Sequence, residues 1–153
     1  MYSSPLKRAY ETACILRGDR DIPIIKDDRL REVNFGINEG KCSLELKKDK
    51  NSPIYKFFED PGNYQPPEGG ESLHDVCKRT KEFMEEIIEP QKDKLSNVLI
   101  AGHGAMNKGI MCHVLNHPIK EYWSGGLQKN CGIIIVKLDE NGYEKNRRNI
   151  KLK

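Results

Sequence analysis

A histidine between two glycines is the residue of this chain best placed for chemistry. His103 follows the short apolar run 97–101, and an apolar helical pattern begins directly after Gly104. A short apolar run without alternation predicts a parallel strand buried on both faces. Because the first N–H groups of a helix attract anions, His103 and Gly104 are predicted to line an anion site. The alternative is a histidine that only caps a strand end.

Two charged residues are also suited to phosphate chemistry. Arg8 lies in the first turn of a predicted helix that starts at the carboxyl end of a strand, where a guanidinium can bind two phosphate oxygens. The helix dipole disfavours a cation there, which suggests an anionic ligand. Glu32 lies in a charged loop, where a partly desolvated carboxyl could act as a general acid against the influence of nearby cations. In isolation, Arg8 reads better as an exposed arginine, and Glu32 is indistinguishable from a surface glutamate.

The elements that must position these residues begin abruptly. Tyr2 and Ser3 are typical of a strand end, Ser4 of a helix N-cap and Pro5 of a first helical position. Apolar residues follow at helical spacing. Because the body of the strand does not precede them, we expect a truncated chain, a clipped gene model or a rearranged fold.

The remaining pattern predicts a single α/β domain over residues 1–153. Residues 22–25 predict a short strand, which Pro23 confines to a sheet edge or to a strand start. Residues 41–70 show no sustained period and end in a stretch rich in proline and glycine. They predict a lid over a site, with short helical pieces near 44–48 and 54–58.

The strongest helix signal follows Ser72, where a capping box completed by Asp75 precedes an apolar stripe at i, i+3, i+4 and i+7. Residues 105–115 predict the next helix, and residues 131–138 predict a second buried strand. An Asp-Glu-Asn-Gly turn then leads into a polar strand at 143–150, which is suited to a sheet edge.

Other polar residues have simpler interpretations. Glu71 is explained by helix capping, and Arg79 by a solvated helix flank or an ion pair. His113 and His117 have the i, i+4 spacing of two metal ligands. However, no third ligand is evident and Pro118 ends the helix, so we predict no metal site.

The composition narrows the possible partners. A net charge of +3 with 32% charged residues favours small anions over nucleic acid, and the basic tail 145–153 suits a protected edge strand. The five cysteines contain no CxxC pair, which indicates reduced thiols. No apolar run has the length of a membrane span, and no signal peptide is evident. We expect a cytoplasmic protein without a membrane or nucleic-acid partner.

Four motifs, in order, carry a family resemblance. They are Ser3-Ser4-Pro5-Leu6-Lys7-Arg8-Ala9 with Glu11-Thr12-Ala13, Leu30-Arg31-Glu32 with Phe35-Gly36 and Glu39-Gly40, Gly69-Gly70-Glu71-Ser72, and Val98-Leu99-Ile100-Ala101-Gly102-His103-Gly104. With them, the chain resembles the histidine phosphatase superfamily, also called the phosphoglycerate mutase-like family. The resemblance implies a three-layer α/β/α fold around a mixed, mostly parallel sheet.

The resemblance also implies roles. Arg8 resembles the family's second phosphate-binding arginine, and Glu32 resembles its proton donor. His103 resembles the second active-site histidine, which contacts the phosphoryl group without becoming phosphorylated, and Gly104 adjoins it. The implied reaction is phosphoryl transfer from a small phosphorylated metabolite to a histidine, followed by attack of water with help from Glu32. It needs no metal and no cofactor.

One departure limits what the resemblance implies. The family's nucleophilic histidine lies in an Arg-His-Gly motif after its first strand, and this sequence contains no such motif. The family's first strand and first helix are lacking by this comparison, a segment of roughly 30 residues or more. That strand is central in the family, so we expect an open sheet between the strands at 98–101 and 132–138. The chain alone is predicted to be inactive.

Three functions stay open at this point. The first is a phosphatase whose nucleophile lies in a missing N-terminal segment, and the second is a phosphoglycerate mutase-type isomerase. The short 41–70 stretch favours the phosphatase. The third is a non-catalytic module in which Arg8 and His103 hold inorganic phosphate or a phosphorylated ligand. Strands from another copy could close the open sheet in a homo-oligomer.

Overall fold

The computed structural model describes residues 1–146, and a small parallel sheet lies at its centre. The strands are β1 Tyr2–Ser3, β2 Ile25–Lys26 and β3 Ile100–Ala101, in the order β2-β1-β3. Tyr2 is paired in parallel register with Ile25 on one side and Ile100 on the other. β1 is therefore the middle strand, and its carboxyl end lies beside the carboxyl end of β3.

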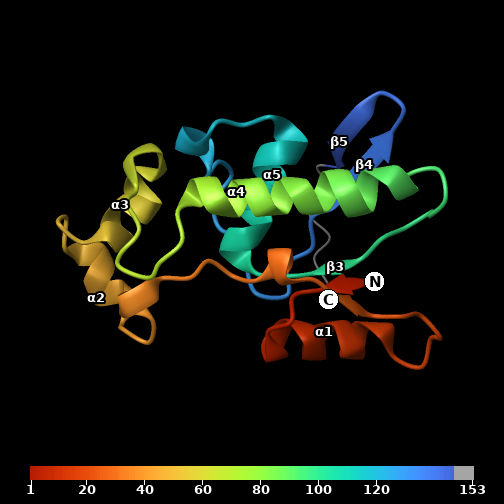
Figure 1. Ribbon diagram of the computed structural model, residues 1–153, viewed down its shortest axis with the longest axis horizontal. Helices are drawn as coiled ribbons and strands as arrows, with labels where there is room; N and C mark the ends of the chain where they lie inside the picture. The colour runs from red at the N-terminus through yellow and green to blue at the C-terminus, as the bar shows by residue number, and fades with distance from the viewer. Residues whose placement is uncertain (147–153) are drawn as a thin grey trace.

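Helices cover both faces of this sheet. The α-helices of the described part are α1 Lys7–Arg17, α2 Ser43–Lys48, α3 Pro53–Glu59, α4 Leu73–Phe83 and α5 Gly104–Leu115. α1 lies on one face, and α4 and α5 lie on the other, which gives three layers (Figure 1). α2 and α3 lie beside the N-terminal end of α4, outside the layers (Figure 1). The predicted α/β/α architecture with a parallel sheet is confirmed.

The apolar stripe of α4 packs into the core, as its spacing predicts. Its buried residues are Leu73, Val76, Thr80 and Phe83. The capping box is also formed, because the Ser72 hydroxyl accepts the Asp75 N–H and the Asp75 carboxylate accepts the Ser72 N–H. The helix continues through a π-helical turn, Met84–Ile88, and a 3-10 turn, Glu89–Gln91. The Phe83 ring meets Tyr2 edge-on, which ties α4 to the central strand.

The first helix starts later than the sequence predicts. Ser4 was expected as its N-cap, but α1 begins at Lys7 after Leu6, whose side chain makes no capping hydrogen bond. The Ser4 hydroxyl instead accepts the N–H of Leu6 at 3.3 Å, one turn before the helix. The Ser4 N–H donates to the carbonyl of Ala101 at 2.9 Å, so this residue still belongs to the sheet ladder.

The prediction of a second buried strand at 131–138 is wrong. β4 Ile135–Asp139 pairs only with β5 Gly142–Asn146, as an antiparallel hairpin separate from the central sheet. Ile133 and Ile134 before it are exposed. Within residues 1–146 no strand pairs with the outer edge of β3, so no ladder joins the hairpin to the sheet. The predicted polar strand is found up to Asn146, and its residues 147–150 lie outside the described residues.

The prediction of a strand buried on both faces at 97–101 is wrong, because β3 covers only Ile100–Ala101 at an edge of the described sheet and Leu99 is exposed. Other predicted elements are present with small shifts. β2 begins at Ile25 and lies at the sheet edge, as Pro23 requires. α5 starts at Gly104, one residue earlier than predicted, while α2 and α3 cover the two short helices expected within 41–70. In the described part of the chain, no helix combines the length and the apolar character needed to cross a membrane.

Candidate active site

His103 lies where β3 ends and α5 begins, as the sequence predicts. It occupies the N-cap position of α5 in an extended conformation, and only 7% of it is exposed. Its ring atom Nε2 is 2.8 Å from the hydroxyl oxygen of Ser4, which is fully buried at the end of β1. The adjacent carboxyl ends of β1 and β3 thus bring together residues 99 positions apart in the sequence.

Glu32 reaches the same helix from a distant loop. Its carboxylate accepts the N–H of Met106 at 2.8 Å and the N–H of Ala105 at 3.3 Å, and it also accepts the N–H of Val33. The first two amides belong to the first turn of α5, where no helical carbonyl is available to them. Two of the amides that the sequence offered to an external anion are therefore held by a carboxylate of the chain itself. Glu32 and His103 are brought together, as the resemblance implies.

Arg8 lies in the first turn of α1 with an exposed side chain. Within residues 1–146, no carboxylate or carbonyl binds its guanidinium. Its charge nevertheless acts on His103 and lowers the pKa of that imidazole. Arg8 is thus near enough to the His103 end of the sheet to attract an anion placed there.

Gly104 is the first residue of α5, directly after His103. A Cβ atom at this position would lie 3.2 Å from Cδ1 of Leu127, so a larger residue would crowd that side chain. The helix therefore starts close against the loop that carries Leu127. Its backbone is part of the N-terminal turn, which attracts anions.

The surroundings of His103 favour a neutral ring. Burial lowers the pKa of His103 most, and the positive charges of Arg8 and Arg79 lower it further, whereas the Glu32 carboxylate raises it. The resulting pKa lies below the ordinary value for histidine. At neutral pH the imidazole therefore acts as a neutral hydrogen-bonding group rather than as a cation.

Arg79 is a residue whose proximity to the site the sequence did not reveal. Its Nε and Nη2 atoms bind the two carboxylate oxygens of Glu71 at 2.6 and 2.9 Å, and Nη1 donates to the carbonyl of Arg29 at 2.5 Å. The ion pair proposed for Arg79 is confirmed, but the residue is not on a solvated flank, since its side chain is 17% exposed. The sequence feature that could have indicated this ion pair is a glutamate just before α4, Glu71, with an arginine, Arg79, two turns into the helix.

Comparison with known proteins decides the family. The model of the histidine phosphatase superfamily, branch 1, matches residues 1–151. The chain belongs to the histidine phosphatase superfamily. The resemblance carried by the four sequence motifs is therefore confirmed.

Relatives within the superfamily include both phosphatases and mutases. The chain is 29% identical over 153 residues to phosphoserine phosphatase 1 of Hydrogenobacter thermophilus, covering 100% of this chain and 68% of that protein. It is 33% identical over 115 residues to a 2,3-bisphosphoglycerate-dependent phosphoglycerate mutase of Cytophaga hutchinsonii, covering 74% and 54%. The chain thus spans about half to two thirds of the length of these relatives.

Solved structures share the fold of this chain. Bacillus stearothermophilus YhfR matches with a TM-score of 0.81 at 33% identity, over 94% of this chain and 70% of that one. A mycobacterial glucosyl-3-phosphoglycerate phosphatase in complex with inorganic phosphate matches with a TM-score of 0.79 at 24% identity, over 98% and 76%. The second likeness concerns the fold alone.

Tyr122 supports the start of α5. It is buried, and its hydroxyl donates to the carbonyl of Ala105 at 2.8 Å. Burial raises the pKa of Tyr122 well above its ordinary value, so the phenol stays protonated and keeps donating. No local pattern in the sequence predicted this position of Tyr122, because the contact joins α5 to a loop that follows it.

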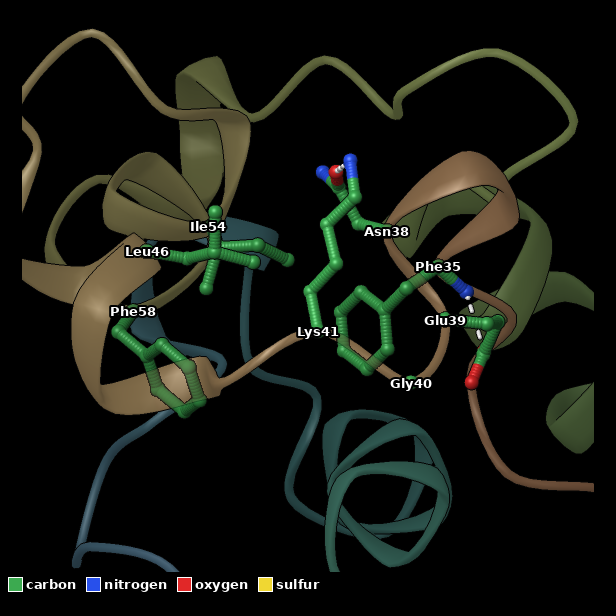
Figure 2. A pocket seen from close by; sticks show the side chains of 8 residues that line it. All are labelled: Phe35, Asn38, Glu39, Gly40, Lys41, Leu46, Ile54 and Phe58. Carbon is green, nitrogen blue, oxygen red and sulfur yellow. Dashed lines mark hydrogen bonds between the residues drawn. The ribbon is translucent and has the colours of Figure 1, made fainter.

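The region predicted as a lid lines a separate cavity (Figure 2). The cavity has a volume of about 150 Å³ and is lined by Phe35, Asn38, Glu39, Gly40, Lys41, Leu46, Ile54 and Phe58. Apolar side chains of α2 and α3 face Phe35 across it, and the Lys41 ammonium donates to the Asn38 amide oxygen at 2.9 Å (Figure 2). Glu32 and His103 are not among the lining residues. Whether residues 41–70 close over the site stays a prediction.

Proposed function

We propose that this site binds the phosphoryl group of a small phosphorylated metabolite and serves phosphomonoester hydrolysis through a phosphohistidine. Membership of the superfamily supports phosphoryl transfer, and the relative named as a phosphoserine phosphatase supports hydrolysis. One observation carries the proposal to this chain: His103 and Glu32 meet at the first turn of α5, within reach of the charge of Arg8.

The roles follow from the chemistry of each group. Arg8, His103 and the N-terminal backbone of α5 at Gly104 bind the phosphoryl oxygens and stabilise their developing charge. A histidine nitrogen attacks phosphorus, the ester oxygen leaves with a proton from Glu32, and a water then releases phosphate from the phosphohistidine with Glu32 as base. These steps consume one ester and one water and give one alcohol and one phosphate, without a metal.

The nucleophile sets the activity expected of the 153-residue polypeptide. In the superfamily it lies in an Arg-His-Gly motif, and these 153 residues contain none. We therefore propose that this polypeptide binds phosphate and does not turn a phosphomonoester over. The second candidate is a non-catalytic module in which Arg8 and His103 hold a phosphorylated ligand. The mutase activity is less favoured, because residues 41–70 are short for retaining a bisphosphorylated intermediate.

Thermal stability measured with inorganic phosphate, and again with vanadate, tests the binding. A ligand present at 100 times its dissociation constant stabilises the native state by about 2.7 kcal/mol, so phosphate should raise the melting temperature. Arg8→Gln should abolish most of this rise. Lys7→Gln is the matched control, because it removes a neighbouring positive charge whose side chain is 88% exposed and pairs only loosely with Glu11.

Two outcomes would overturn parts of the proposal. If phosphate stabilises neither the wild type nor the Lys7→Gln protein, the site does not bind phosphate. If the purified 153-residue polypeptide hydrolyses p-nitrophenyl phosphate, and His103→Ala removes that activity, the polypeptide has a nucleophile that the sequence comparison does not identify. The cytoplasmic location and the homo-oligomer remain predictions that these experiments do not test.

A further inference from the structure

Ser4 makes a buried contact that the mechanism above does not use. Its hydroxyl oxygen lies 2.8 Å from Nε2 of His103, and the residue is fully buried. The position of Ser4 is fixed by the sheet, since its N–H donates to the carbonyl of Ala101 at 2.9 Å. The carbonyl of His103 accepts the N–H of Asn107 at 2.9 Å, so the backbones of both partners are held by hydrogen bonds.

The other hydrogen bonds of Ser4 determine which partner is the donor in its contact with His103. A serine hydroxyl has one proton to donate and two lone pairs to accept with. One lone pair of Ser4 already accepts the N–H of Leu6 at 3.3 Å. Within residues 1–146, the only acceptor facing the Ser4 proton is Nε2 of His103. If Nε2 carried a proton instead, the buried Ser4 proton would be left without an acceptor, which is unfavourable.

We propose that Ser4 is a positioning residue that holds His103 in the neutral tautomer with its proton on Nδ1. Nδ1–H is then the remaining donor of the ring, and it serves the phosphoryl oxygens as a neutral group. The proposal rests on the proposed function for the identity of that ligand. The choice of tautomer does not depend on it.

The charged groups around the ring are compatible with this tautomer. Arg8 on α1 and Arg79 on α4 both disfavour a proton on the ring, and Glu32 favours one. Neither arginine lies within hydrogen-bond distance of the ring, so they oppose the cation without choosing between the two neutral tautomers. That choice is left to the Ser4 hydroxyl.

Long-range proton–nitrogen NMR correlation of the imidazole rings tests the proposal directly. The chain has four histidines, so the His103 signals can be assigned by comparison with His103→Gln. In the wild type at pH 7 we expect the neutral ring with Nδ1 protonated. In Ser4→Ala we expect a mixture of tautomers and a rise of the His103 pKa by about half to one pH unit, because the hydrogen bond to the neutral ring is lost.

Ser3→Ala is the matched control. Ser3 is equally buried and adjacent, but its hydroxyl donates to the carbonyl of Ser4 at 2.9 Å and not to His103. The Nδ1–H tautomer should persist in Ser3→Ala, and also in Ser4→Thr, which keeps the hydroxyl. A Ser4 that is only structural would lower stability in Ser4→Ala without changing the tautomer, and this result would overturn the proposal.

The wild type alone can also decide against the proposal, even if Ser4→Ala does not fold. A His103 ring protonated on Nε2 at pH 7, or on both nitrogens, refutes it. Titration with inorganic phosphate separates this failure from failure of the proposed function. If the Nδ1–H tautomer is present but phosphate shifts no His103 signal, the inference about Ser4 stands and phosphate binding at this site is wrong.

Discussion

Glu32→Ala is the substitution that best tests how this site is built. Glu32 accepts two first-turn amides of α5, at 2.8 and 3.3 Å, and places a negative charge at the positive end of the helix dipole. Loss of a capping acceptor costs about 0.5–2 kcal/mol, and loss of a favourable charge costs about 0.3–1 kcal/mol. Because the second hydrogen bond is long, we expect the free energy of unfolding to fall by about 1–2 kcal/mol.

Urea unfolding followed by circular dichroism measures this loss. Glu68→Ala is the control, because Glu68 is an exposed glutamate whose carboxylate makes no hydrogen bond or ion pair within residues 1–146. Its free energy of unfolding should stay within about 0.5 kcal/mol of the wild type. If Glu32→Ala is as stable as Glu68→Ala, the carboxylate does not cap α5 in solution, and the description of the site is wrong.

Glu32→Ala also tests whether the Glu32 carboxylate and a bound phosphate compete for the N-terminal end of α5. Removal of the Glu32 carboxylate frees the amides of Ala105 and Met106 and removes a negative charge that repels a dianion. The increase in melting temperature caused by phosphate should therefore be larger in Glu32→Ala than in the wild type. A smaller increase would mean that the carboxylate and the phosphate do not compete for this helix end.

Two further predictions concern the framework. Gly109→Ala should lower the free energy of unfolding by about 1–2 kcal/mol, because its Cβ would lie 2.7 Å from the Thr80 hydroxyl oxygen in the α4–α5 contact, and unchanged stability in urea would contradict this packing. Burial raises the pKa of Glu89, but hydrogen bonds, chiefly from His113, hold it below its ordinary value. The folded state therefore gains stability from Glu89 above about pH 4.5 and loses it as the pH falls. Acid unfolding of Glu89→Gln should start from a lower stability and depend less on pH in this range, and an unchanged pH profile would refute the linkage.

The sequence was sufficient to predict those parts of the fold whose pattern lies within one chain segment. The capping box at Ser72 and Asp75 and the apolar stripe after it lie within a few turns of one chain segment, so α4 could be predicted closely. The strand-to-helix junction around His103 was also predicted, because an apolar run precedes it and a helical pattern follows it, although β3 is a short edge strand and not one buried on both faces. The contacts that complete the site were not readable. Glu32 meets Met106 across 74 residues, and no period in the sequence links them.

The wrong prediction at 131–138 has a physical cause. An apolar run reads as a buried strand only if neighbouring strands bind its backbone and cover its side chains. In the structure β4 has a single partner, β5, and no strand of the described residues joins it to β3. Ile133 and Ile134 are consequently exposed although their residue types suit a core. This is the open sheet that the family resemblance led us to expect between these segments.

The charges around His103 explain why we propose that phosphate binding depends most on Arg8, a residue that looks ordinary in the sequence. Arg79 is already paired with Glu71, and Glu32 is held by backbone amides. Arg8 makes no ion pair or hydrogen bond within residues 1–146, so its full charge is available to an arriving anion. An exposed arginine in a first helical turn looks ordinary until β1 and β3 place it near a buried histidine. Loss of Arg8 should therefore weaken phosphate binding more than it changes stability, whereas loss of Arg79 should do the reverse because it leaves Glu71 unpaired.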